Sequence, residues 1–148
     1  LPTEQEWEKA AAWDNLNSIL WQYGFQSNSI GCNRCNYNAY YEGGGVCVGH
    51  TSEVGSYNGS NNTVDSKTIF GCYDMTGNVH QWLQGRYAPP TTLDRRTLRG
   101  GSWNDPVSAP SLRTASRTLF AAPTTTSNQI GLRVVRTPAT ASADFDAE

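Results

Sequence analysis

The feature that most constrains this sequence is a long stretch without periodicity. From Trp21 to Asn62 the chain consists largely of Gly, Ser, Asn and Tyr, and its apolar residues recur at neither helical nor strand spacing. A structureless segment of this length is unusual inside a compact domain. We therefore expect specific cross-links to hold it, with metal ions and disulfides as the candidates.

Four cysteines are available for such cross-links. Only Cys32 and Cys35 have the C-x2-C spacing, and a structural zinc site usually needs two such pairs. Loop residues surround this pair, which argues against a thioredoxin-like redox site, because that site needs a strand before it and a helix after it. Zinc and plain buried thiols stay open beside a disulfide, which is favoured. We predict a Cys35–Cys47 disulfide, because the glycine turn at 43–45 could fold one cysteine onto the other.

Local signals predict only a few regular elements. Thr3 and Glu6 form a capping box that starts a helix over residues 3–14. A glycine pair interrupts one of the expected strands. The predicted strands are 79–83, 96–103 and 130–136. Residues 137–148 lack any periodicity and are expected to form a flexible tail.

Composition argues against two classes of function. The chain has 148 residues, which fits one domain. Its net charge of −2 is wrong for a protein that binds nucleic-acid phosphates, so no nucleic-acid partner is expected. No apolar run approaches the roughly 20 residues that cross a bilayer, so no membrane span is expected. The chain starts at Leu1 without a Met or a signal-peptide pattern, which indicates a processed chain or a fragment.

Five blocks of sequence, in a fixed order, carry a resemblance to a known family. They are LPTEQEWEKAA at 1–11, VGSY at 54–57, FGCYDMTGNVHQW at 70–82, LRGGSW at 98–103 and IGLRVVR at 130–136. In these blocks the sequence resembles the formylglycine-generating-enzyme (sulfatase-modifying factor) family. The resemblance implies an α+β domain with the C-type-lectin fold over residues 1–136 and little regular secondary structure. It also implies that the family's N-terminal part is missing, and that an N-terminal segment would complete the fold.

The catalytic chemistry of this family is not indicated in the sequence. The family's oxidases hold copper with two cysteines shortly after the GGS strand, since soft thiolates suit Cu(I). The corresponding stretch, 104–113, contains no cysteine, so we expect no copper and no oxidase activity. An iron site of three histidines is also excluded, because the chain contains only His50 and His80.

The family also contains ligand binders, among them the variable proteins of diversity-generating retroelements. In these proteins the stretch between the GGSW strand and the last strand is mutagenised to make binding variants. The resemblance therefore favours a non-catalytic module that binds a protein or cell-surface ligand through residues 104–129. The residues expected on this variable face are Asn104, Asp105, Val107, Ser108, Pro110, Ser116, Thr118, Leu119, Phe120, Thr124, Thr125, Ser127 and Asn128.

The composition of residues 104–129 is typical of such a history. Adenine-directed mutagenesis of an asparagine codon cannot produce Lys, Glu, Gln, Met or Trp, and Gln129 is the segment's sole exception. Leu119 and Phe120 are the expected apolar anchors of the face. Arg113 and Arg117 are expected to brace the segment, because a guanidinium can satisfy several carbonyl groups. We expect a cell-surface, secreted or phage-associated location for such a binder.

Members of the family bind calcium through a segment that matches residues 74–81. The ligands implied by this resemblance are Asp74, Gly77, Val79 and Gln81, whose side-chain and carbonyl oxygens are of the type that calcium prefers. Gln81 replaces the usual glutamate, which removes one negative charge. Two alternatives to the diversified binder stay open. One is a fragment of an enzyme whose catalytic residues lie elsewhere, and the other is an invariant lectin that binds sugar through calcium.

Overall fold

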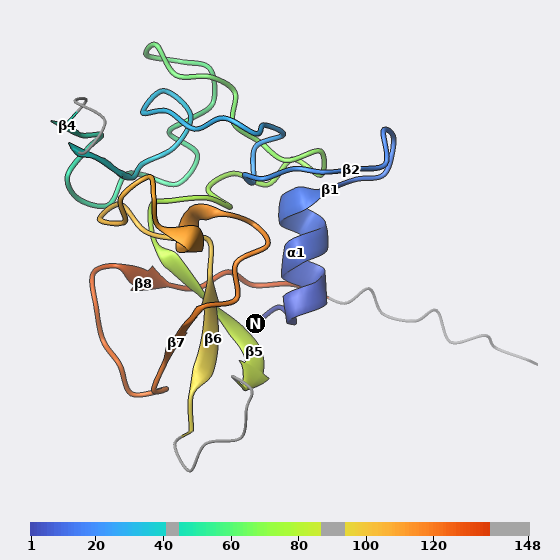
Figure 1. Ribbon diagram of the computed structural model, residues 1–148, viewed down its shortest axis with the longest axis vertical. Helices are drawn as coiled ribbons and strands as arrows, with labels where there is room; N and C mark the ends of the chain where they lie inside the picture. Colours follow the sequence, from blue (N-terminus) through green and yellow to red (C-terminus); the bar gives the residue numbers. More distant parts are fainter. Residues whose placement is uncertain (41–44, 87–93, 137–148) are drawn as a thin grey trace, which may run out of the picture.

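The computed structural model describes residues 1–40, 45–86 and 94–136. In this part of the chain a helix lies beside a small sheet, and long irregular segments cover one end of both (Figure 1). The tail predicted at 137–148 lies outside the described residues. Residues 43 and 44 of the glycine turn, on which the predicted disulfide rested, lie outside them as well.

The regular elements are short. Helix α1 spans Glu4–Ala12, and a single turn of 3-10 helix, η2, spans Pro110–Leu112. The strands are β1 (Trp13–Asp14), β2 (Ile19–Leu20), β3 (Asn38–Ala39), β4 (Gly45–Val46), β5 (His80–Arg86), β6 (Arg96–Arg99), β7 (Leu119–Ala121) and β8 (Ile130–Gly131). Neither helix of the described ranges is long and apolar enough to cross a membrane.

Helix α1 begins where the capping box predicts. The Glu6 amide donates to the Thr3 hydroxyl (3.2 Å), and the Thr3 amide donates to the Glu6 carboxylate (2.8 Å). The helix ends at Ala12, earlier than predicted, because Trp13 adopts an extended backbone and pairs with Leu20 in the β1–β2 hairpin.

The main sheet contains four strands in the order β7-β6-β5-β8. β5 runs antiparallel to β6 and parallel to β8, and β6 pairs with β7. The first two predicted strands correspond to β5 and β6. β6 stops at Arg99 because Gly100 and Gly101 adopt φ angles of 93° and 76°, which glycine adopts without steric cost. A side chain at Gly101 would also collide with Leu112.

Two parts of the sheet differ from the prediction. The strand expected at 130–136 pairs with β5 only over Ile130–Gly131. β7 lies in a stretch that was expected to be a loop, and its register against β6 places Leu119 opposite Leu98. A strand of three residues leaves little periodicity in the sequence, and its pairing depends on residues far along the chain.

Two clusters of buried side chains form the core. The first lies between α1 and the sheet and contains Trp7, Ala11, Met75 and Leu83. The second lies under the irregular segments and contains Tyr23, Phe25, Cys35, Tyr37, Ala39 and Leu112. The rings of its first two members are stacked, with centroids 5.7 Å apart. The stretch without periodicity therefore has an aromatic core of its own.

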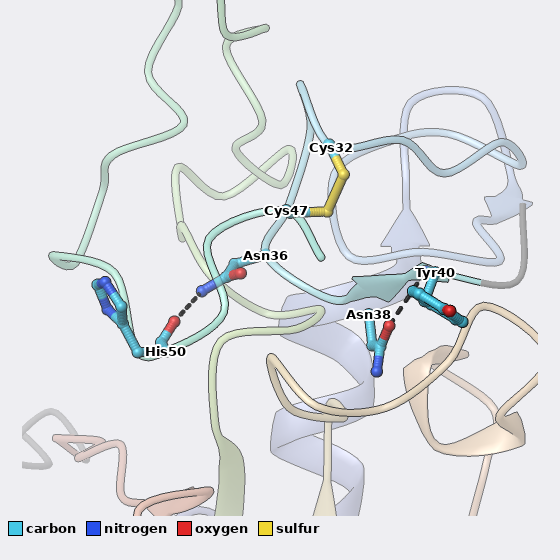
Figure 2. The surroundings of a disulfide bond; sticks show 6 residues. All are labelled: Cys32, Asn36, Asn38, Tyr40, Cys47 and His50. Atoms are coloured by element: carbon cyan, nitrogen blue, oxygen red, sulfur yellow. Dashed lines mark hydrogen bonds between the residues drawn. A yellow bond between two sulfur atoms is a disulfide. The ribbon is translucent and has the colours of Figure 1, made fainter. Parts of the chain in front are cut away.

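The disulfide joins Cys32 to Cys47, so the predicted Cys35–Cys47 pairing is wrong (Figure 2). The amide of Cys35 donates to the Gly31 carbonyl in a tight turn, and the Cys35 side chain is buried in the aromatic core. Cys32 lies on the exposed side of the same turn, 5.1 Å from Cys47 between Cα atoms. Burial raises the pKa of the Cys35 thiol well above its usual range, which keeps it a neutral thiol.

Candidate functional site

The two ends of the segment 104–129 are tied together beside β5. The Ser102 hydroxyl lies 3.1 Å from a carboxylate oxygen of Asp105 and 3.2 Å from the side-chain oxygen of Gln129. The indole of Trp103 donates to the Asn128 carbonyl (3.3 Å). The amide of His80 donates to the Gln129 carbonyl (2.7 Å). The segment therefore leaves the sheet and returns to it at nearly the same place.

Asp105 supports this junction and is only partly exposed. His80 lies 3.5 Å from one of its carboxylate oxygens, and the Ser111 hydroxyl donates to the other. Burial acts to raise the pKa of Asp105, but hydrogen bonds from His80 and Ser111 outweigh it, so this pKa lies below its ordinary value. Both serine hydroxyls of the cluster, Ser102 and Ser111, contact the carboxylate, and neither forms a hydrogen bond with the imidazole. The cluster therefore lacks a serine activated by a base.

The side chains of residues 104–129 differ in their exposure to solvent. None of the thirteen residues predicted on the variable face is buried. Those that are exposed are Asn104, Ser108, Pro110, Thr118, Thr124, Thr125, Ser127 and Asn128. Those that are partly buried are Asp105, Val107, Ser116, Leu119 and Phe120. In contrast, Ser111, Leu112 and Thr114, which were not predicted on the face, are buried.

The two predicted apolar anchors lie on the edge strand β7. Phe120 pairs with Thr97 and Leu119 pairs with Leu98. The guanidinium of Arg95 lies over the Phe120 ring, 4.6 Å from its centre. Both side chains are thus partly covered by the sheet and its neighbours, and present only part of their surface outward.

Val107 also faces inward, because it packs against the aromatic core under the irregular segments. The two arginines that were expected to brace the segment differ from each other. Arg117 pairs with Glu4 (3.4 Å) and Glu8 (3.1 Å), so it braces the segment through carboxylates of the helix and not through loop carbonyls as expected. Arg113 is exposed, and its guanidinium forms no hydrogen bond or ion pair within the described part of the chain.

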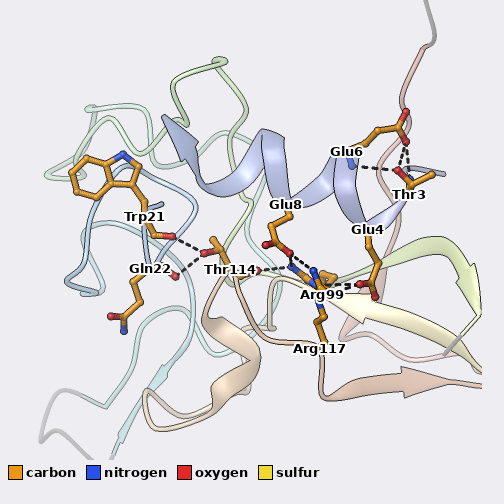
Figure 3. Close-up of polar contacts among 9 residues, drawn as sticks. All are labelled: Thr3, Glu4, Glu6, Glu8, Trp21, Gln22, Arg99, Thr114 and Arg117. Atoms are coloured by element: carbon orange, nitrogen blue, oxygen red, sulfur yellow. Dashed lines mark hydrogen bonds and ion pairs between the residues drawn. The ribbon is translucent and has the colours of Figure 1, made fainter. Parts of the chain in front are cut away.

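A buried arginine that sequence reasoning missed connects the segment to the helix (Figure 3). The Arg99 side chain is 0% exposed and lies over the Trp7 ring, 4.9 Å from its centre. Its guanidinium donates to the Glu8 carboxylate (2.8 Å) and to the Thr114 carbonyl (2.5 Å). The sequence signal for this contact was the spacing of Glu4 and Glu8, which places two carboxylates on one face of the helix.

The predicted calcium segment is held by protein groups. Gln81 donates to the Asp74 carbonyl (2.7 Å), and its side-chain oxygen accepts from the Trp7 indole (2.8 Å) and from Arg133 (3.2 Å). The Arg133 guanidinium also donates to the Tyr73 carbonyl (2.6 Å). In this arrangement the Gln81 oxygen is fully engaged and a positive charge lies beside it, so the residues do not fit a calcium ion unless Arg133 moves away.

If a calcium ion were bound at this segment, the Asp74 carboxylate would have to supply the negative charge that compensates it. Its carboxylate accepts from the Gly55 amide (2.7 Å). Burial raises the pKa of Asp74, and this effect exceeds the opposing influence of the Gly55 amide and Arg133. Gly77 is buried with φ at 76°, close to the Asn36 carbonyl. Calcium binding through Asp74, Gly77, Val79 and Gln81 stays a prediction.

Comparison with known proteins places this geometry in a family. Residues 1–138 match the family described as the sulfatase-modifying factor enzyme 1-like domain. The chain belongs to this family, as the sequence blocks predicted.

Among curated relatives, the inactive C-alpha-formylglycine-generating enzyme 2 of Mus musculus is 36% identical over 106 residues, which cover 71% of this chain and 32% of that protein. The hercynine oxygenase of Mycolicibacterium smegmatis is 29% identical over 122 residues, covering 70% of this chain and 26% of that protein. The chain therefore spans between about a quarter and a third of the length of the curated relatives that it matches.

Two solved structures share the fold over 89% of this chain. CarF superposes with a TM-score of 0.67 at 26% identity, and 44% of its chain is covered. Treponema denticola variable protein 1 superposes with a TM-score of 0.64 at 25% identity, and 45% of its chain is covered. These likenesses confirm the C-type-lectin fold of the formylglycine-generating-enzyme type, and the predicted resemblance to a retroelement variable protein.

The charge on Asp105 should make the segment's anchorage depend on pH. The folded-state pKa of Asp105 lies below the unfolded value, so its contribution is present above about pH 4 and is lost as pH falls through the folded pKa. We expect the wild type to have a larger free energy of unfolding than Asp105→Asn at pH 6. The difference between the two proteins should shrink below pH 4. Urea unfolding from pH 6 to pH 2 measures this. A constant difference would contradict it.

Calcium binding at 74–81 should depend on Arg133. Because this guanidinium contacts Gln81 and Tyr73, we expect Arg133→Met to destabilise the fold by about 1–3 kcal/mol without calcium. Added calcium should then raise the melting temperature of the variant more than that of the wild type. Scanning calorimetry with calcium or with magnesium as the control measures both effects. Equal calcium shifts in the two proteins would show that Arg133 does not compete with the ion.

Proposed function

We propose that this chain is a non-catalytic ligand-binding module, a retroelement-diversified variable protein whose binding face is built from residues 104–129. The observation that supports the proposal is that some residues of this segment hold it against the rest of the fold, whereas others are exposed. Its ends are tied at Ser102 and Trp103, its buried residues join the core, and eight of the thirteen predicted residues are exposed, while Asp105 and Val107 belong to its supports. A loop of this kind can change its surface residues without disturbing its supports.

Similarity to other proteins supports this assignment. One solved neighbour is named a variable protein, and curated relatives are named inactive formylglycine-generating enzymes. In this chain the stretch 104–113 contains no cysteine, so it lacks the thiolates that a copper oxidase needs there. A protein or cell-surface ligand suits an open face of hydroxyl and amide side chains, which form adaptable polar contacts. A cell-surface, secreted or phage-associated location belongs to the same proposal.

An N-terminal segment that completes the fold is also proposed. Apolar side chains remain exposed after β8, at Leu132, Val134 and Val135. A groove of about 440 Å³ beside them is lined by Leu1, Trp82 and Leu132, among others. Exposed apolar surface of this kind favours coverage by another segment, because burial removes it from water.

The DNA that flanks the gene tests the diversification directly. We expect a second, near-identical copy of the sequence encoding residues 102–134, differing mainly at adenines, with a reverse-transcriptase gene nearby. The differing codons should fall among the thirteen predicted residues, mainly at the eight that are exposed and less at Asp105 and Val107, which support the segment. If no second copy exists, the segment is an ordinary loop, and the enzyme fragment and the invariant calcium-dependent lectin become the better assignments.

Substitutions on the exposed part of the face should leave the fold intact. We expect Asn104→Tyr and Thr125→Tyr to change the free energy of unfolding by less than about 1 kcal/mol, since both side chains are exposed. Leu112→Ala is the matched control inside the same segment and should cost about 2–5 kcal/mol, because Leu112 is 0% exposed. Chemical denaturation measures all three. Broad unfolding of the two exposed variants would contradict the proposed face.

A further inference from the structure

A groove runs along α1 on the side of the β1–β2 hairpin. It consists of two hollows, of about 280 Å³ and 390 Å³, that share Glu8 and Leu20 in their linings. The first hollow also contains Lys9 and Arg117, and the second also contains Trp21 and Arg113. We call these two hollows together the α1 groove. Its walls come from the helix, the hairpin and the proposed binding segment, which contributes Arg113, Thr114, Ala115 and Arg117.

The walls of the α1 groove are fixed by hydrogen bonds. The Thr114 amide donates to the Gln22 carbonyl (2.9 Å), and the Thr114 hydroxyl donates to the Trp21 carbonyl (2.6 Å). The Trp21 amide donates in turn to the Ala12 carbonyl (2.9 Å). These bonds join the segment, the hairpin and the end of the helix, as Figure 3 shows around Thr114. The groove is therefore formed before any ligand arrives, which lowers the cost of binding.

The charges along the groove are unbalanced. The carboxylates of Glu4 and Glu8 balance the guanidiniums of Arg99 and Arg117, with Glu8 2.8 Å from Arg99 and 3.1 Å from Arg117, and Glu4 3.7 Å and 3.4 Å from the same side chains. Lys9 and Arg113 are exposed, and neither side chain forms a hydrogen bond or ion pair with the residues that the structure describes. The groove thus carries two uncompensated positive charges in a chain whose net charge is −2.

Asp14, in the adjoining hairpin, does not supply the missing negative charge. It is buried, and its carboxylate accepts hydrogen bonds from the amides of Leu16 and Asn17 within the hairpin turn. Between the two basic side chains, Leu20 is 61% exposed, and Trp21 beside it is partly buried. The groove therefore contains an apolar patch, formed by Leu20 and Trp21. Among the described residues, the unpaired cation of Lys9 lies in one hollow beside this patch, and that of Arg113 lies in the other.

We propose that the α1 groove binds an acidic, extended peptide segment of a protein partner. Carboxylates of the partner pair with Lys9 and Arg113, and an apolar side chain of the partner packs against Leu20 and Trp21. This goes beyond the proposed function, because the groove is lined by Arg113, Thr114, Ala115 and Arg117 of the binding segment and by none of the thirteen residues predicted on the variable face. It assigns Arg113 a ligand contact, whereas Arg117 holds the wall of the site.

The test uses three fluorescein-labelled peptides and the whole chain. One peptide alternates aspartate with phenylalanine, the second replaces the aspartates by asparagine, and the third replaces the phenylalanines by alanine. In fluorescence anisotropy we expect saturable binding of the first, and binding weaker by about tenfold or more for each of the others. Added salt should weaken the first complex, because the ion pairs are exposed. Equal binding of all three peptides, or no saturable binding of the first, would overturn the proposal.

Reversing the charge of Arg113 tests whether the peptide binds in the α1 groove. Arg113→Glu should weaken binding of the first peptide by about tenfold or more, whereas Arg136→Glu, a change of equal charge at another exposed arginine, should leave it unchanged. Both variants should retain the wild-type unfolding curve, because both side chains are exposed. An unchanged affinity of Arg113→Glu would overturn the assignment.

Failure of this inference can be distinguished from failure of the proposed function. A second gene copy with adenine-directed differences, together with no peptide binding, would refute the α1 groove and leave the diversified face in place. Peptide binding without a second copy would support an invariant protein-binding groove and refute diversification.

Discussion

The buried guanidinium of Arg99 is the interaction on which the arrangement of helix, sheet and segment depends. A charge without solvent contact is costly unless it is paired and hydrogen-bonded. Glu8 and the Thr114 carbonyl receive its protons, and the Trp7 ring covers its face. Because these partners come from α1 and from the 104–129 segment, neither can shift relative to β6 without leaving the charge unpaired.

In this fold, side chains form many of the hydrogen bonds to backbone groups that helices and strands provide in folds with more regular secondary structure. Asn78 exchanges two hydrogen bonds with the backbone of Ser52, at 3.0 and 3.2 Å. Asn36 donates to the His50 carbonyl (2.7 Å), and the Thr76 hydroxyl accepts from the Gly24 amide (2.9 Å). Buried backbone groups need partners wherever they lie. In the irregular half of this molecule, buried amide and hydroxyl side chains provide many of them.

The local part of the fold was predictable from the sequence, and the long-range part was predictable only through the family blocks. The capping box at Thr3 depends on neighbours within one helical turn, so its pattern is visible in the sequence. The partner of Cys47 depends on which cysteine the turn at Gly31 directs inward, and spacing does not reveal that. At the site, eight of the thirteen residues predicted within 104–129 are exposed, whereas the partial burial of Asp105 and Val107 depends on distant partners that spacing does not reveal. The separate roles of Arg113 and Arg117 could not be predicted, because they depend on carboxylates of the helix.

The tie between Ser102 and Gln129 has a consequence for how much the intervening chain can vary. Because the closure is made by residues at its two ends, the cost of closing the loop depends on the number of residues between them only logarithmically. Doubling that number costs only about 0.6 kcal/mol of loop-closure entropy. Insertions and deletions in the exposed stretch 122–128, between β7 and Gln129, are therefore thermodynamically accessible, whereas the stretches that contain Leu112, Thr114 and β7 are held by further contacts.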